Sequence, residues 1–138
     1  MTSGPVLPEG QRLMSHLVDF DSLPPIDVWG EAVRARALHG ERMSMALVEL
    51  APGAPVPEHR HEQEQMGFCI EGSVRFRIGD EIREFGPGGT WRIPSNEAHE
   101  VVAGPEGAIV VDVFAPIRED WDDLPHVEPQ PGRWPARP

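Results

Sequence analysis

Frequent prolines and glycines restrict this chain more than any other feature, because they divide it into short segments. The 138 residues include 16 prolines and 14 glycines, and both residue types are unfavourable inside helices. Long helices are therefore disfavoured, and short strands joined by tight turns are favoured. The length fits one domain. Because the hydrophobic fraction of 39% is ordinary for a globular chain, we expect a single buried core.

Short apolar runs follow one another along the middle of the chain. Strands are expected over residues 33–38, 43–50, 67–70, 74–78, 82–85, 90–93, 97–102 and 108–114. The clearest alternation places Val74, Phe76 and Ile78 on one face of a strand and the intervening arginines on the other. About eight strands with tight turns predict an all-β protein built as a closed sandwich or barrel.

The two ends of the chain differ from its strand-rich middle. Residues 1–25 are expected to form an N-terminal arm, residues 26–118 the β-barrel, and residues 119–138 a proline-rich C-terminal tail that wraps onto the barrel and ends loosely. An arm beside an unpaired sheet edge can add a strand to a neighbouring subunit. We therefore expect a homodimer.

Charge and cysteine content exclude several classes of partner. Twelve Lys and Arg against 23 Asp and Glu give a net charge of −11, which opposes binding to nucleic acid or to an anionic membrane. The single Cys69 cannot close an intrachain disulfide, and no apolar run approaches the roughly 20 residues of a membrane helix. The N-terminus has no secretory pattern. We expect a soluble cytoplasmic protein with no nucleic-acid or membrane partner.

The most informative stretch is His-Arg-His-Glu-Gln-Glu-Gln from His59 to Gln65. Residues two apart on an extended chain share a face, so His59 and His61 place two imidazoles side by side, and Gln65 has the same parity. Glu64 has the opposite parity and is the alternative ligand. His99, from a later strand, is the candidate third imidazole. Three imidazoles and one amide oxygen leave open positions on a divalent ion such as Zn, Ni, Mn or Fe.

Two spaced patterns in the chain resemble the two motifs of the cupin family. The first pattern consists of Gly53, His59, His61, Gln65 and Gly72, with Gln at the position usually held by Glu. The second consists of Gly88, Pro94, Asn96 and His99, with Asn in place of the usual Gly. The resemblance covers about residues 26–118. It implies a double-stranded β-helix, or jelly roll, which agrees with the strand count.

A closer likeness is to small single-domain cupins of the KdgF type, associated with pectin and alginate breakdown. It rests on residues 59–72 and on the segment 111–121. This resemblance implies that His59, His61, Gln65 and His99 bind a divalent metal. It also implies that a second group of residues lines the substrate pocket: Asp112, Phe114 and Arg118.

The donor set suggests the chemistry of the site. Three neutral imidazoles and a neutral amide leave the full charge of +2 on the ion, which makes it a strong Lewis acid for a small anionic molecule. Arg118 can add a two-pronged contact to a substrate carboxylate, and Asp112 can move a proton. We therefore expect a metal-dependent isomerase or lyase-type enzyme that opens or tautomerises an unsaturated uronate-like sugar acid.

Three alternatives to this reaction stay open at this point. An Fe(II)-type dioxygenase would use the same imidazoles and open positions for oxygen chemistry. A non-catalytic module would only capture a small acid or a metal ion. A cluster of histidines without any metal is the third alternative.

Overall fold

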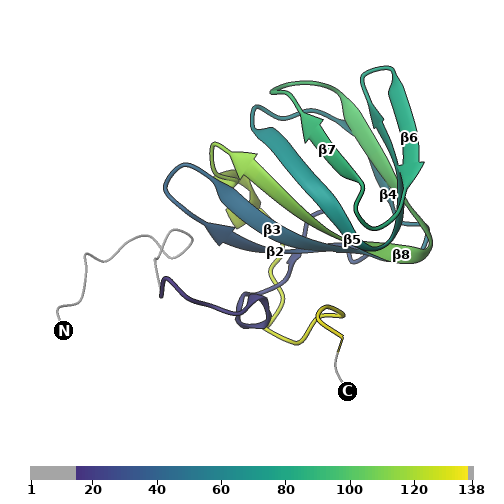
Figure 1. The fold of residues 1–138 in the computed structure, drawn as a ribbon. Coiled ribbons are helices and arrows are strands. Elements are labelled where there is room, and N and C mark those ends of the chain that lie inside the picture. The colour runs from purple at the N-terminus through teal and green to yellow at the C-terminus, as the bar shows by residue number, and fades with distance from the viewer. Residues whose placement is uncertain (1–14, 137–138) are drawn as a thin grey trace.

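The computed structural model describes residues 15–136, and nearly all of its regular structure is antiparallel β-sheet (Figure 1). The strands are β1 (Ile26–Asp27), β2 (Val33–His39), β3 (Ser44–Leu50), β4 (Pro55–His59), β5 (Glu64–Ile78), β6 (Glu81–Phe85), β7 (Thr90–Ile93) and β8 (His99–Ala115). Two short 3-10 helices, η2 (Phe20–Ser22) and η3 (Glu119–Asp123), flank them. The all-β prediction is confirmed. In the described range, no helix is long and apolar enough to span a membrane.

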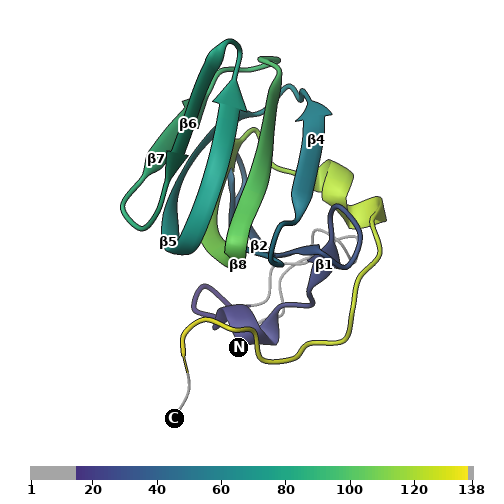
Figure 2. The ribbon, with the colours of Figure 1, turned by 90° about the vertical axis from the view of Figure 1, so that its right-hand side faces the viewer.

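Two long, bent strands, β5 and β8, belong to both layers of the structure. The first half of β5 pairs with β7 on one side and with the end of β8 on the other. The end of β8 also pairs with β3, β3 pairs with β2, and β2 pairs with β1. The second half of β5 pairs with β6 and with the beginning of β8, which pairs on its other side with β4. Figure 2 shows β5, β8 and β4 side by side. The two sheets formed in this way enclose the core.

The structure corrects the sequence prediction at three strands. Residues 67–70 and 74–78, expected as separate strands, are parts of β5, and residues 97–102 and 108–114 are parts of β8. The expected breaks are irregularities in the pairing of β5 with β8, next to Glu71 and Gly72 in β5 and between Ala103 and Ala108 in β8. Gly72 has a φ of 76°, and a Cβ there would lie 2.0 Å from the Gly107 carbonyl oxygen. Strand β4 was missed because Pro55 and Pro57 argue against a strand, but β4 pairs only with β8 and prolines are tolerated at a sheet edge.

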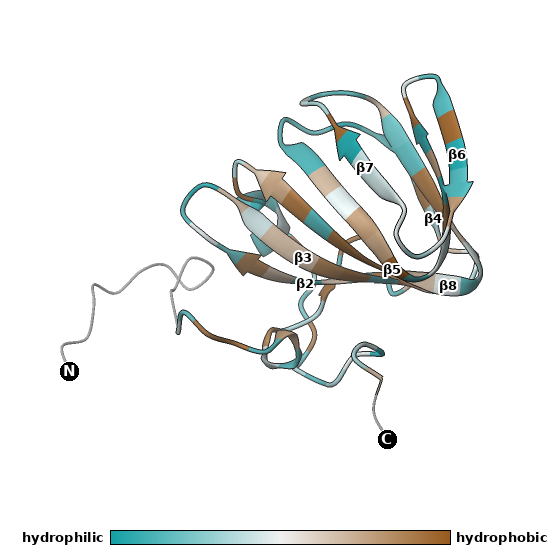
Figure 3. Cartoon of the chain, viewed as in Figure 1, coloured by the Kyte–Doolittle hydropathy of each residue, from teal (hydrophilic) through white to brown (hydrophobic). Residues whose placement is uncertain are grey.

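Alternation along the strands determines which side chains fill the space between the two layers. Val74 and Phe76 are buried, as predicted, whereas Arg75 between them is exposed. Hydrophobic and hydrophilic residues also alternate in bands along β6 (Figure 3). Aromatic side chains occupy part of the interior, and the Phe76 ring lies 4.7 Å from that of Trp91, centroid to centroid. Val74, Phe76 and Trp91 also line a cavity, so the core does not fill the barrel completely.

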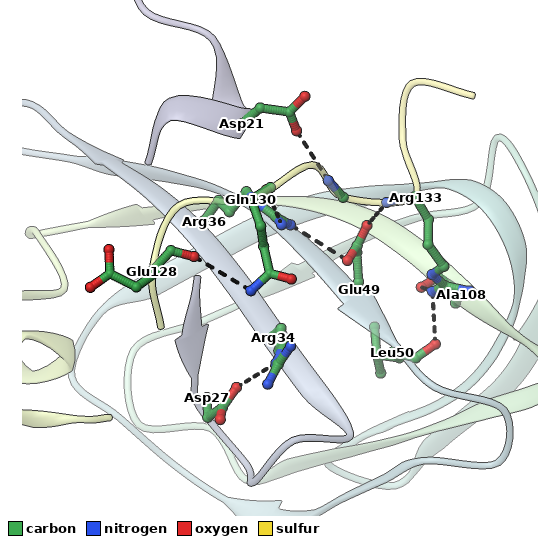
Figure 4. Close-up of polar contacts among 11 residues, drawn as sticks. Asp21, Asp27, Arg34, Arg36, Glu49, Leu50, Ala108, Glu128, Gln130 and Arg133 are labelled. Atoms are coloured by element: carbon green, nitrogen blue, oxygen red, sulfur yellow. Dashed lines mark hydrogen bonds and ion pairs between the residues drawn. The ribbon is translucent and has the colours of Figure 1, made fainter. Parts of the chain in front are cut away.

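The C-terminal segment packs against the outer side of β2 and β3 through polar contacts (Figure 4). Arg36 is 2% exposed and donates to the backbone carbonyl oxygen of Gln130 at 3.0 Å. Arg133 donates to the carbonyl oxygens of Leu50 and Ala108 at 3.1 and 3.2 Å. Most of the predicted N-terminal arm, residues 1–14, lies outside the described residues.

Candidate metal centre

Three histidines from different parts of the chain converge at one end of the barrel. His59 is the last residue of β4 and pairs with His99, the first residue of β8. His61 lies in the bend between β4 and β5. One ligand nitrogen of each ring lies within 4.8 Å of those of the other two, a spacing that suits three bonds of about 2 Å to a single ion. The structure thus brings the three histidines together, although a bend rather than strand parity positions His61.

Each imidazole is oriented by a hydrogen bond to the backbone. The Nδ1 atoms of His59, His61 and His99 lie 2.8, 2.9 and 2.8 Å from a carbonyl oxygen two residues away along the chain. A carbonyl oxygen only accepts, so each Nδ1 carries the proton and each neutral ring keeps its lone pair on Nε2. Nε2 of His99 is buried and has no hydrogen-bond partner among the described residues. A metal ion fits this donor set, because ligating histidines characteristically hold their second nitrogen in this way.

The surroundings keep these rings neutral. Burial lowers the pKa of His59 and of His61, and the nearby Arg118 guanidinium acts in the same direction. For His99, burial lowers the pKa to about 4. All three rings are therefore neutral near pH 7, which is the state that can bind a metal ion.

Gln65 joins the histidines, and Glu64 does not. The Gln65 side chain is 7% exposed, and its Oε1 lies 3.1 Å from Nε2 of His61. Glu64, its neighbour on β5, is exposed. Of the two residues considered from sequence, the structure therefore places Gln65 at the cluster.

Asp112 lies behind Gln65 in the interior. It is 7% exposed, and its Oδ1 accepts hydrogen bonds from Nε2 of Gln65 at 2.9 Å and from Nε1 of Trp91 at 2.7 Å. Burial raises the pKa of Asp112 to about 6, although these two hydrogen bonds and the charge of Arg118 act in the opposite direction. Trp91 is not among the site residues singled out from the sequence. No local spacing pattern indicates its contact with Asp112, which depends on cross-strand register.

Arg118 is held by a carboxylate and two aromatic rings. Its Nε and Nη2 lie 3.1 and 3.0 Å from the two oxygens of Asp120, and its guanidinium carbon lies 4.6 Å from the centre of the Phe114 ring and 4.5 Å from that of Trp121. Arg118 is thus paired with Asp120 and not with Asp112. Asp120 and Trp121 were missed because their roles arise from the turn at η3.

All seven site residues singled out from the sequence line one cavity of about 390 Å³. They are His59, His61, Gln65, His99, Asp112, Phe114 and Arg118. Much of the remaining wall is apolar and includes Trp29, Val48 and Trp91. A cavity with convergent polar groups and apolar walls is suited to a small organic ligand.

Comparison with known proteins identifies the family. Residues 46–114, half of the chain, match the sequence profile described as the Cupin domain. The chain belongs to the cupin family. The double-stranded β-helix predicted from sequence is consistent with this membership. The predicted fold also agrees with the structure of a cupin from Shewanella frigidimarina, described as RmlC-like. That structure superimposes with a TM-score of 0.72 at 23% identity, covering 78% of this chain and 96% of the other.

Two further similarities point to a smaller group of cupins. This cupin is 28% identical to the pectin degradation protein KdgF of Dickeya dadantii over 104 residues, which is 74% of this chain and 94% of the relative. The structure of KdgF from Halomonas sp. superimposes with a TM-score of 0.65 at 26% identity, covering 70% of this chain and 88% of the other. The resemblance to small cupins of the KdgF type is therefore confirmed.

Proposed function

We propose that this cupin binds a divalent metal ion and isomerises a small unsaturated sugar acid of the uronate class. The observation that carries the proposal is the convergence of three imidazole Nε2 atoms and an amide oxygen at a cavity that also contains Arg118 and Asp112. The similarity to a pectin degradation protein supports the substrate class.

The proposed metal ligands are His59, His61, His99 and Gln65. All four donors are neutral, so a bound Zn, Ni, Mn or Fe ion keeps its charge of +2 and can polarise a hydroxyl or carbonyl oxygen of the substrate. The chain's own contribution is to fix the rings through their Nδ1 hydrogen bonds. Rings held in this way lose little freedom when they ligate.

Arg118 is proposed to bind the substrate carboxylate. The guanidinium has the planar fork that matches a carboxylate, and the Phe114 and Trp121 rings hold it in place. In the structure the fork is paired with Asp120, whose side chain is 53% exposed. The Arg118 side chain is only 10% exposed, so Asp120 is the solvent-facing member of the pair, and a substrate carboxylate would take its place on the fork. Phe114 would then form one wall beside the bound ring.

Asp112 is proposed to move the proton. Opening a cyclic unsaturated uronate breaks the bond between the anomeric carbon and the ring oxygen, while the anomeric hydroxyl loses its proton. The resulting enolate gains a proton at carbon to become a ketone. One proton leaves an oxygen and one arrives at a carbon, so no oxidant or co-reactant is needed. Oδ1 of Asp112 is engaged by Gln65 and Trp91, whereas Oδ2 makes no hydrogen bond with another described residue and serves as the transfer atom.

The experiment is to incubate the purified, metal-loaded cupin with an unsaturated uronate and to follow loss of the conjugated-enol absorbance. The expected result is accelerated decay that a chelator abolishes and that Asp112→Asn lowers by about 10²–10⁴-fold, as for loss of a general acid–base group. Glu64→Gln, an exposed neighbour of the site, is the matched control and should retain full activity. Equal decay with and without the protein would contradict the proposal.

The same preparation separates the two alternative functions. Oxygen uptake during turnover would instead indicate a dioxygenase. Stoichiometric heat of binding without turnover would indicate a binding module.

A further inference from the structure

A row of three residues crosses the sheet directly behind the proposed metal site. Gly67 on β5 is opposite Trp91 on β7 and also opposite Asp112 on β8. The side chains of Trp91 and Asp112 meet across the intervening strand, with Nε1 2.7 Å from Oδ1. Adjacent strands are about 4.8 Å apart, so this contact spans two strand spacings. It forms only because the strand between them carries no side chain at that point.

Gly67 leaves the space for this contact. A Cβ at position 67 would lie 2.3 Å from Oδ1 of Asp112 and 2.5 Å from Nε1 of Trp91. A glycine within a strand is unfavourable unless another group must approach closely. Here two of the three approaching groups are the partners of the hydrogen bond, and the third is the backbone carbonyl oxygen of Val111, at 2.5 Å. Gly67, Trp91 and Asp112 therefore act together, and we call them the Gly67 row.

The Gly67 row determines which atom of Gln65 faces the histidines. Oδ1 of Asp112 can only accept, so the Gln65 amide turns its nitrogen toward Asp112 at 2.9 Å. Its oxygen then points toward the cluster, 3.1 Å from Nε2 of His61. That nitrogen carries a lone pair because Nδ1 holds the proton. The amide is thus oriented as a metal ligand by a residue that does not itself belong to the histidine cluster.

We propose that the Gly67 row positions the Gln65 oxygen toward the metal and makes position 65 selective for Gln over Glu. This inference rests on the proposed metal site. A Glu at position 65 would set a second carboxylate oxygen near 2.9 Å from Oδ1 of Asp112, where two negative charges repel each other and one of the groups is driven to take up a proton. An Asn at position 112 would remove that charge repulsion, because its amide is neutral. Its oxygen, in the place of Oδ1, can still accept from Trp91.

The role is that of a positioning residue, and it differs from the proton transfer assigned to Oδ2. Asp112→Asn keeps an oxygen that accepts from both Gln65 and Trp91, so it preserves positioning while it removes the transferable proton. Asp112→Leu removes both functions. Metal affinity therefore reports on positioning, and turnover reports on proton transfer.

The experiment titrates chelator-treated protein with Zn²⁺ in a calorimeter, using the wild type, Asp112→Asn, Asp112→Leu, Gln65→Glu and the double variant Gln65→Glu/Asp112→Asn. Glu64→Gln is the control for a charge change beside the site, and circular dichroism checks that each variant folds. Asp112→Asn should keep the zinc Kd within about threefold, and Asp112→Leu should weaken it by about 10–100-fold, as for loss of a ligand-orienting partner. On the Gln65→Glu background, Asp112→Asn should tighten zinc binding by about tenfold.

The outcomes distinguish this inference from the proposed function. If Asp112→Asn has the same effect on both backgrounds, or if it weakens zinc binding as much as Asp112→Leu does, the positioning role is wrong and the metal site stands. If the wild type itself binds no zinc or other divalent ion, the proposed function fails and the inference fails with it. The background dependence comes from isosteric variants, so a folding defect in Asp112→Leu does not affect that comparison.

Discussion

Replacing Ser44 by Ala tests how the turn that carries Arg118 is held to the barrel. Ser44 is the first residue of β3 and is 0% exposed. Its Oγ accepts a hydrogen bond from the Arg118 backbone N–H at 2.8 Å and lies 2.7 Å from Nδ1 of His39. The hydroxyl thus links the Arg118 backbone to the His39 ring through two hydrogen bonds. Although a serine, a histidine and the nearby Asp122 lie together, Ser44 is inaccessible to substrate and serves as a structural link.

The size of the effect follows from what the substitution leaves unpaired. The Arg118 N–H is buried and loses its acceptor, which costs about 1–3 kcal/mol of unfolding free energy. Nδ1 of His39 loses its hydrogen-bond partner, but the His39 side chain is 20% exposed and can bind water instead. For a chain of this length, 1 kcal/mol lowers Tm by about 3–4 °C. We therefore expect Tm to fall by about 3–12 °C.

The stability assay is thermal and urea unfolding of chelator-treated protein. The kinetics on the unsaturated uronate use the metal-loaded protein. Ser22→Ala is the matched control, since Ser22 donates to the Asp19 carbonyl oxygen at 2.7 Å in an exposed turn and its loss should change stability by less than about 0.5 kcal/mol. Ser44→Ala should also raise KM, because Arg118 loses its anchor. If Ser44→Ala is as stable as Ser22→Ala, the reasoning about this buried link is wrong.

Four further predictions follow from the site and the surface. Arg118→Lys, which loses the fork and the ring contacts, should raise KM for the uronate by about tenfold or more with a smaller change in kcat. Chelation should lower Tm of the metal-loaded protein, and added Zn²⁺ should restore it in proportion to ln[Zn²⁺]. Burial lowers the pKa of His39 in the folded protein. His39 therefore contributes stability above its usual pKa of about 6.5, and this contribution is lost as the pH falls through the lower pKa of the folded state. The difference in unfolding free energy between wild type and His39→Gln should decrease from pH 8 to pH 5. Light scattering should give about twice the 15.3 kDa mass of the chain if it is the predicted homodimer, and Met66→Lys, on an exposed apolar face, should reduce that mass.

The spacing of residues along the chain was sufficient to find the site but not to explain it. The two motifs identified His59, His61 and His99, and the structure brings these three rings together. Strand parity assumes that the chain is extended from His59 to Gln65. The three histidines do converge, but the chain bends between β4 and β5, so parity is not the reason that His61 joins the other two. Parity predicted that Gln65 and Glu64 point to opposite faces, and in β5 Gln65 is buried whereas Glu64 is exposed. Which of the two binds a metal stays a prediction.

What the sequence did not reveal depends on contacts between strands distant in the chain. Trp91 reaches Asp112 only because Gly67 is in register with both, and register across three strands is not encoded in any local pattern. The breaks expected near Gly72 and Gly107 are the places where β5 and β8 bend and approach each other. Glycines there predict turns and bulges equally well, and only the pairing partners decide between them.

The most direct test of the account is the metal content of the protein. Elemental analysis of the purified wild type should find about one divalent metal ion per chain, and the variant with His59, His61 and His99 all replaced by Ala should contain essentially none while remaining folded. A wild type that binds no metal when supplied with Zn, Ni, Mn or Fe, or a triple variant that retains the same metal content, would contradict the account.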